Sequence, residues 1–63
     1  ITMTSNIETL AHNYSTIHKN ACEIWTHGAV RKAWYDKGGN VCLQYSDKQW
    51  WHYSQKNGYL EWW

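Results

Sequence analysis

The chain has 63 residues and a formal net charge of +1. It is therefore expected to form one small domain, residues 1–63. The charge excludes an acidic nucleic-acid mimic and gives no support for a strongly basic nucleic-acid binder. Leu, Ile and Val total nine and Phe is absent, but six Trp and five Tyr supply rings that can bury about 150–250 Å² each. No apolar run approaches the roughly 20 residues that cross a bilayer, and we find no secretory signal, which predicts a cytoplasmic protein without a membrane segment.

A helix is predicted over about residues 5–27. Apolar residues recur there at alternating spacings of three and four, which places them on one face: Ile7, Leu10, Tyr14, Ile17, Ala21 and Ile24. Ser5 and Glu8 fit a capping box, and Gly28 suits the left-handed residue that ends a helix. Asn13 and its polar neighbours are weak helix formers. Because the apolar spacing runs through them unchanged, we expect one continuous helix.

From residue 31 onward the apolar period changes to two, which indicates β-strands. Four short runs are predicted as strands: 31–36, 41–45, 49–54 and 59–63. Turn residues separate them at Gly38-Gly39, at residues 46–48 and at Asn57-Gly58, the last being a strong hairpin signal. The predicted fold is therefore α+β, with one N-terminal helix packed on one face of a four-stranded antiparallel β-meander over about residues 31–63.

The loop lengths predict the strand register. Two-residue loops at Gly38-Gly39 and Asn57-Gly58, with a three-residue loop between them, pair Trp34 with Leu43 and Leu43 with Trp51. All three loops then agree on one apolar face, which the helix should cover: Trp34, Val41, Leu43, Tyr45, Trp51, Tyr53, Leu60 and Trp62. A slip of one residue would turn every side chain of a strand to the other face.

The opposite face of this sheet is left without a covering layer, because one helix cannot cover both sides. We predict that it is a binding surface, formed by Tyr35, Trp50, His52, Tyr59, Glu61 and Trp63. Trp and Tyr are the residue types that dominate protein–protein hot spots.

Metal binding and catalysis are not favoured by the residue pattern. His18 and Cys22 share one side of the helix, and Cys42 and His52 would complete a four-ligand zinc set. The predicted register instead turns Cys42 and His52 away from the helix, so we expect two free thiols, no metal and no cofactor. No nucleophile elbow or suitable carboxylate pair is present, and the domain is too small for a deep pocket, which predicts a protein that is not an enzyme.

The predicted function is that of a non-enzymatic protein-binding module. Small proteins without catalytic groups often act as inhibitors that occupy a partner's surface, as phage and mobile-element proteins do; the partner would be another protein, a second copy included. The alternative is a single-stranded nucleic-acid binder that uses the same aromatic rings with Arg31, Lys32, Lys48 and Lys56. Residues 31–63 carry five basic and three acidic residues, a net of only +2, which favours the protein partner.

Overall fold

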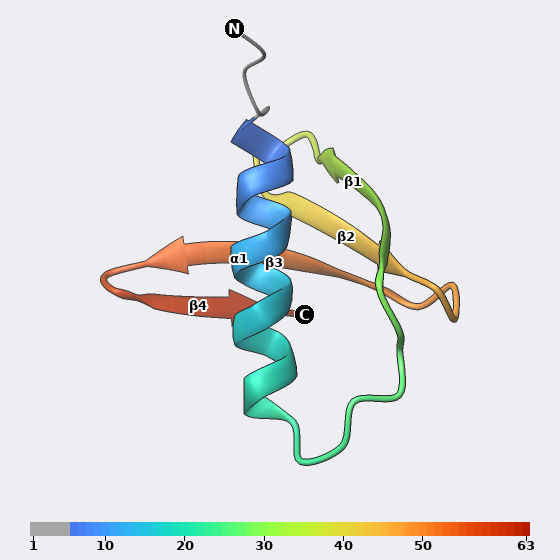
Figure 1. Cartoon of the computed structure of the whole chain (residues 1–63). Helices are drawn as coiled ribbons and strands as arrows, with labels where there is room; N and C mark the ends of the chain where they lie inside the picture. Colours follow the sequence, from blue (N-terminus) through green and yellow to red (C-terminus); the bar gives the residue numbers. More distant parts are fainter. Residues whose placement is uncertain (1–5) are drawn as a thin grey trace, which may run out of the picture.

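A single helix lies across one face of a four-stranded antiparallel sheet in the computed structural model, which describes residues 6–63 (Figure 1). The elements are α1 (Asn6–Ala21), β1 (Val30–Tyr35), β2 (Val41–Tyr45), β3 (Trp50–Lys56) and β4 (Tyr59–Trp62). The strands are ordered β1-β2-β3-β4, so each pairs with the next along the chain. The predicted α+β meander is confirmed. We call the sheet face that packs on α1 the inner face and the opposite one the outer face.

The helix is continuous through Asn13, as predicted, but it ends at Ala21 rather than near residue 27. The Cys22 amide donates to the Lys19 carbonyl at 3.2 Å, a tight final turn, and an irregular segment follows. Trp25 in that segment packs edge-on against Tyr45, with ring centroids 4.9 Å apart. This contact with the sheet overrides the helical pattern of the sequence. The capping box predicted for Ser5 and Glu8 includes Ser5, which lies outside the described residues.

The buried face of α1 also differs from the predicted one. The buried residues are Ala11, Tyr14, Ser15 and His18, whereas Ile17 and Ile24 are 44% and 78% exposed. Polar residues can lie on the buried face because they form hydrogen bonds within the protein. Ser15 donates its hydroxyl to the His12 carbonyl at 3.1 Å, and His18 is hydrogen-bonded to Tyr53. The helix is therefore rotated relative to the one that apolar residues alone predict.

The registers of the two later strand pairs are confirmed. Leu43 lies opposite Trp51 across β2 and β3, and Tyr53 lies opposite Trp62 across β3 and β4. Positive φ angles at Lys48 (72°) and Asn57 (45°) provide the tight turns that these registers require.

The register between β1 and β2 is one residue away from the prediction. Trp34 lies opposite Cys42, not Leu43, because the loop closes one residue earlier, between Asp36 and Asn40. The Asp36 carboxylate accepts hydrogen bonds from the backbone amides of Gly38 and Asn40, both at 2.9 Å, and so holds a three-residue loop open. The shift turns every β1 side chain over. Trp34 therefore lies on the outer face and Tyr35 on the inner face, the reverse of the prediction.

Aromatic side chains dominate the core between α1 and the inner face. Ala11 and Tyr14 of the helix pack with four sheet residues: Val41, Leu43, Tyr45 and Tyr53. The Tyr53 hydroxyl lies 2.6 Å from both the Tyr45 hydroxyl and His18 Nδ1. The His18 ring also stacks on Trp62, with centroids 4.4 Å apart. Hydrogen bonds thus compensate the burial of these polar groups.

Acid is expected to destabilise the fold through His18. Burial, followed by the nearby charge of His27, lowers the pKa of the His18 imidazole below its usual 6.5. Below about pH 6.5, His18 is protonated in the unfolded chain but stays largely neutral in the folded protein, so the free energy of unfolding falls as the pH decreases. Thermal melts at about pH 7.5 and 5 should show a lower midpoint at pH 5. His12→Gln, an exposed position on the same helix, should keep this difference, and His18→Gln should reduce it.

Gly28 is expected to tolerate alanine less well than Gly39. Both have positive φ angles, +80° and +83°, which cost an alanine about 1–2 kcal/mol. A Cβ at Gly28 would in addition lie 2.8 Å from Ser46 Cβ, whereas a Cβ at Gly39 meets nothing within 4 Å. We expect Gly28→Ala to lower the free energy of unfolding by about 2–4 kcal/mol and Gly39→Ala by about 1–2 kcal/mol, measured by urea denaturation. Equal losses would contradict the close packing of this loop on Ser46.

Candidate binding surface on the outer face of the sheet

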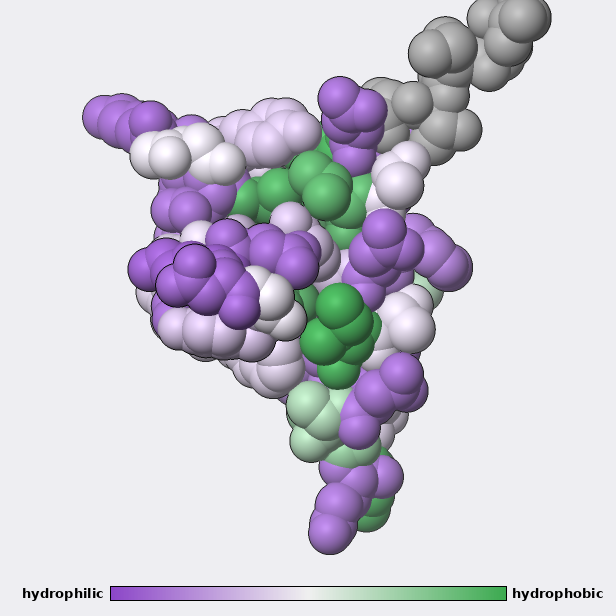
Figure 2. All heavy atoms as spheres, turned by 90° about the vertical axis from the view of Figure 1, so that its left-hand side faces the viewer, coloured by the Kyte–Doolittle hydropathy of each residue, from purple (hydrophilic) through white to green (hydrophobic). Residues whose placement is uncertain are grey.

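The outer face exposes four large aromatic rings, and within residues 6–63 no helix covers it. These are Trp34 (36% exposed), Trp50 (47%), Tyr59 (53%) and Trp63 (54%). From the side of the β3–β4 hairpin, strongly hydrophobic surface is confined to small patches among polar side chains (Figure 2). The large apolar side chains of the outer face are aromatic, each with a polar atom or a polar neighbour.

Three of these rings form a continuous row with His52. The Trp34 and Trp50 centroids are 5.6 Å apart, and Trp50 lies 4.9 Å from His52. The His52 ring stacks on Trp63 at 5.0 Å with an interplanar angle of 2°. Trp63 is held in place because its backbone exchanges both hydrogen bonds with His52, at 3.0 and 3.2 Å, one residue beyond β4. The row is therefore anchored to the sheet along its length.

Five of the six residues predicted for the surface lie on the outer face: Trp50, His52, Tyr59, Glu61 and Trp63. Tyr35 does not, because the β1 register places it opposite Val41 on the inner face. Trp34 takes the place expected for Tyr35. The sequence signal for Trp34 is Asp36, because an aspartate that caps the loop predicts three loop residues and the register that places Trp34 on the outer face.

The four basic residues considered for nucleic-acid binding are dispersed: Arg31 and Lys32 line a groove between α1 and β1, and Lys48 and Lys56 do not. Arg31 lies at the irregularity between Val30 and Lys32, and Lys48 lies in the β2–β3 loop. Lys56 lies at the far end of β3, where its ammonium is 3.7 Å from the Glu61 carboxylate. Only part of this positive charge is available to a ligand on the outer face.

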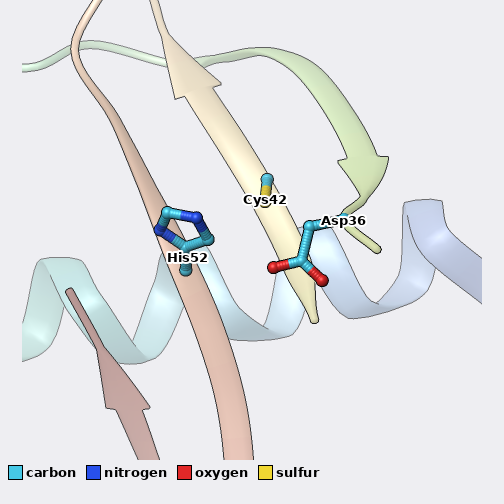
Figure 3. A group of neighbouring side chains, drawn as sticks. All are labelled: Asp36, Cys42 and His52. Carbon is cyan, nitrogen blue, oxygen red and sulfur yellow. The ribbon is translucent and has the colours of Figure 1, made fainter. Parts of the chain in front are cut away.

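Asp36, Cys42 and His52 come together on the outer face, beside the loop that joins β1 to β2 (Figure 3). One potential ligand atom from each lies within 4.8 Å of the others. Cys42 and His52 are cross-strand partners in β2 and β3, and Asp36 follows β1. The sequence pattern indicated Cys42 and His52 but missed Asp36, which the predicted register had turned to the inner face.

The electrostatics of this cluster follow from its burial and hydrogen bonds. The backbone hydrogen bond from Asn40 is the main cause of a lowered Asp36 pKa, so this carboxylate is ionised at neutral pH. Burial, and then the charge of Asp36, raises the pKa of the Cys42 thiol. The thiol is 0% exposed. An unactivated, covered thiol is a poor nucleophile.

The two cysteines are free thiols in the structure and are expected to react at different rates. Cys22 is partly exposed, whereas Cys42 is buried and has a raised pKa. In metal-free native protein, a colorimetric disulfide reagent should modify Cys22 at least about tenfold faster than Cys42, because Cys42 requires local opening. Denatured protein should give two equivalents at a single rate. Equal native rates would contradict the burial of Cys42.

The groove between α1 and β1 lies along an edge strand of the sheet. It encloses about 540 Å³, and its lining includes Glu8, His12, Lys19 and Arg31. These charged groups come from α1 and β1. Among the described residues, the cluster of potential metal ligands lies on the outer face rather than in this groove.

The fold and the outer face together define a small α+β domain in which the described residues leave one aromatic sheet surface without a covering layer. No protein family model matches the chain, and comparison with curated proteins and with solved structures finds no significant match. Within residues 6–63, α1 is too short and too polar to span a bilayer.

Proposed function

We propose that the protein is a non-enzymatic protein-binding module whose contact surface is the outer face. The observation that carries this proposal is the exposure of Trp34, Trp50, Tyr59 and Trp63 together on that face. Exposed apolar patches of this kind usually mark binding surfaces, and Trp and Tyr contribute disproportionately to interface energy. Rings already fixed by their neighbours lose little conformational freedom on binding.

The charge of the outer face supports a protein partner rather than a nucleic acid. Lys32 and Lys56 are offset by Asp36 and Glu61, and Lys56 is already paired with Glu61. Phosphate binding depends on several free cations that release counterions. A near-neutral aromatic face instead matches a partner surface that is itself apolar at its centre with a polar rim.

The size of the surface is compatible with a stable complex. A standard interface buries about 800 Å² on each partner, roughly a sixth of the 4709 Å² accessible surface. One face of a two-layer domain can supply that area. Occupation of a partner's surface, as an inhibitor does, needs no catalytic group, and the covered thiol of Cys42 supports a non-enzymatic role.

The proposal is tested by measuring binding to proteins and to single-stranded nucleic acid separately. A photo-crosslinking residue at position 59, on the outer face, should trap a protein in the source cell, and the same residue at position 12, on the helix, should not. Sedimentation over a range of protein concentrations decides whether that protein is a second copy. Single-stranded oligonucleotides should leave the tryptophan fluorescence unchanged at low salt. Tight, steeply salt-dependent oligonucleotide binding, or equal crosslinking at positions 12 and 59, would overturn the proposal.

A further inference from the structure

We propose that Asp36, Cys42 and His52 form a binding site for Zn²⁺ on the outer face. This inference is independent of the proposed protein-binding function, and it differs from the sequence-based expectation that the protein binds no metal. The three side chains offer one carboxylate oxygen, one thiolate sulfur and one imidazole nitrogen, a donor set that suits zinc.

The strand pairing brings two of the donors together. Each interior residue of an antiparallel strand directs its backbone hydrogen bonds to one side only, and those of His52 go to Trp63. Cys42 and His52 therefore form a non-hydrogen-bonded pair, the kind in which opposite side chains approach most closely. Figure 3 shows the Asp36 carboxylate and the His52 ring on either side of Cys42.

The distances are close to those of a metal site. The three ligand atoms lie within 4.8 Å of one another. Bond lengths of about 2.0–2.3 Å in a tetrahedron place zinc ligands about 3.3–3.7 Å apart. A contraction of this size needs only small side-chain rotations, because Asp36 belongs to a loop and His52 keeps its backbone position in β3.

Hydrogen bonds orient two of the donors as they would in a zinc protein. His52 Nδ1 lies 3.3 Å from the Trp63 carbonyl, so Nδ1 carries the proton and Nε2 is left as the metal donor. Asp36 Oδ1 accepts from the Gly38 and Asn40 amides, and Oδ2 accepts from the Asn40 side chain at 3.2 Å. Oδ1 therefore uses both of its lone pairs, and Oδ2 retains one for a metal ion. Such outer hydrogen bonds are characteristic of metal-ligating histidines and carboxylates.

Because the Cys42 thiol is buried, the cluster suits a metal site better than a catalytic Cys-His-Asp triad. Cys42 is 0% exposed, so a substrate cannot reach its sulfur, whereas a single ion can bind between its neighbours. The ion would displace the thiol proton, which buffer accepts, and its two positive charges would balance the thiolate and the Asp36 carboxylate. Three protein ligands leave a fourth position for water or for a donor atom from another molecule.

The test is titration of the reduced, metal-free full chain with Co²⁺, a spectroscopic probe for zinc sites. We expect tetrahedral visible bands and thiolate-to-cobalt absorption that saturate at one equivalent and disappear when Zn²⁺ is added. Cys42→Ala and His52→Gln should each weaken binding at least about 100-fold, and Asp36→Asn about 10–100-fold. Cys22→Ala removes the other thiol, and His27→Gln removes a histidine that pairs with Asp47 elsewhere; both should bind Co²⁺ normally.

A second measurement does not depend on the Cys42 variant, which could fail to fold. Zn²⁺ should raise the melting temperature of the wild-type protein and of Cys22→Ala, but not that of His52→Gln, whose ring is only partly buried. Absence of cobalt–thiolate absorption, absorption that survives Cys42→Ala, or its loss in Cys22→Ala would each overturn the site. None of these readouts involves a protein partner, so failure of the metal site and failure of the proposed function are distinguishable.

Discussion

Tyr53→Ala is expected to lower the free energy of unfolding by about 3–5 kcal/mol, the range for truncation of a large buried ring. Tyr53 is 1% exposed and lies between Val41 and Trp62 in the sheet. Its hydroxyl joins His18 and Tyr45, both of which would lose their shared partner. A 63-residue domain has a total stability of only about 3–9 kcal/mol. The expected loss is therefore about a third or more of the total stability.

Two variants separate the causes of this loss. Tyr53→Phe keeps the ring and removes only the hydroxyl, so it should cost about 1–3 kcal/mol. Tyr59→Ala removes the same side chain from a position that is 53% exposed, and it should cost less than about 1 kcal/mol. Urea denaturation followed by tryptophan fluorescence measures all three. Similar losses at Tyr53 and Tyr59 would show that the core is not where the structure places it.

The strands and two of the three hairpin registers could be predicted because their signals are local. Asn57-Gly58 fixes a tight turn by its backbone preferences, and the alternation of apolar residues then selects one face. Tyr53 opposite Trp62 follows from these two facts alone. Trp51 also lies on the predicted face, although its ring is only partly buried at the border of the core.

The errors arise where side chains make polar contacts that hydrophobic periodicity does not describe. Asp36 lengthens the first hairpin loop by binding two backbone amides, and the resulting shift exchanges Trp34 and Tyr35 between the faces. His18 reaches the core because Tyr53 provides a hydrogen bond, which rotates α1 away from its apolar stripe. The cluster of Asp36 with Cys42 and His52 depends on the same shift, so it was not accessible from spacing.

Trp50→Ala is expected to weaken partner binding by about 2 kcal/mol or more, about 30-fold, while changing stability by less than about 1 kcal/mol. The side chain is 47% exposed, and its ring contacts Trp34 and His52 at the centre of the aromatic row. Contact with a partner would remove the exposed half of the ring from water, a gain that is absent in the free protein. Tyr35→Ala is the matched control, because Tyr35 is 51% exposed but lies on the inner face. It should bind normally.

The decisive measurement for Trp50 is a paired one, with affinity from calorimetry and stability from urea denaturation on the same preparations. If the partner is a second copy, the affinity is the dimer dissociation constant. Cross-strand aromatic pairs also stabilise sheets without any partner, by about 0.2–1 kcal/mol each. In that case the Trp50 ring would stabilise the sheet through its contacts with Trp34 and His52. A large loss of stability in Trp50→Ala, with normal binding by the molecules that remain folded, would assign the aromatic row to the fold and remove the outer face as the contact surface.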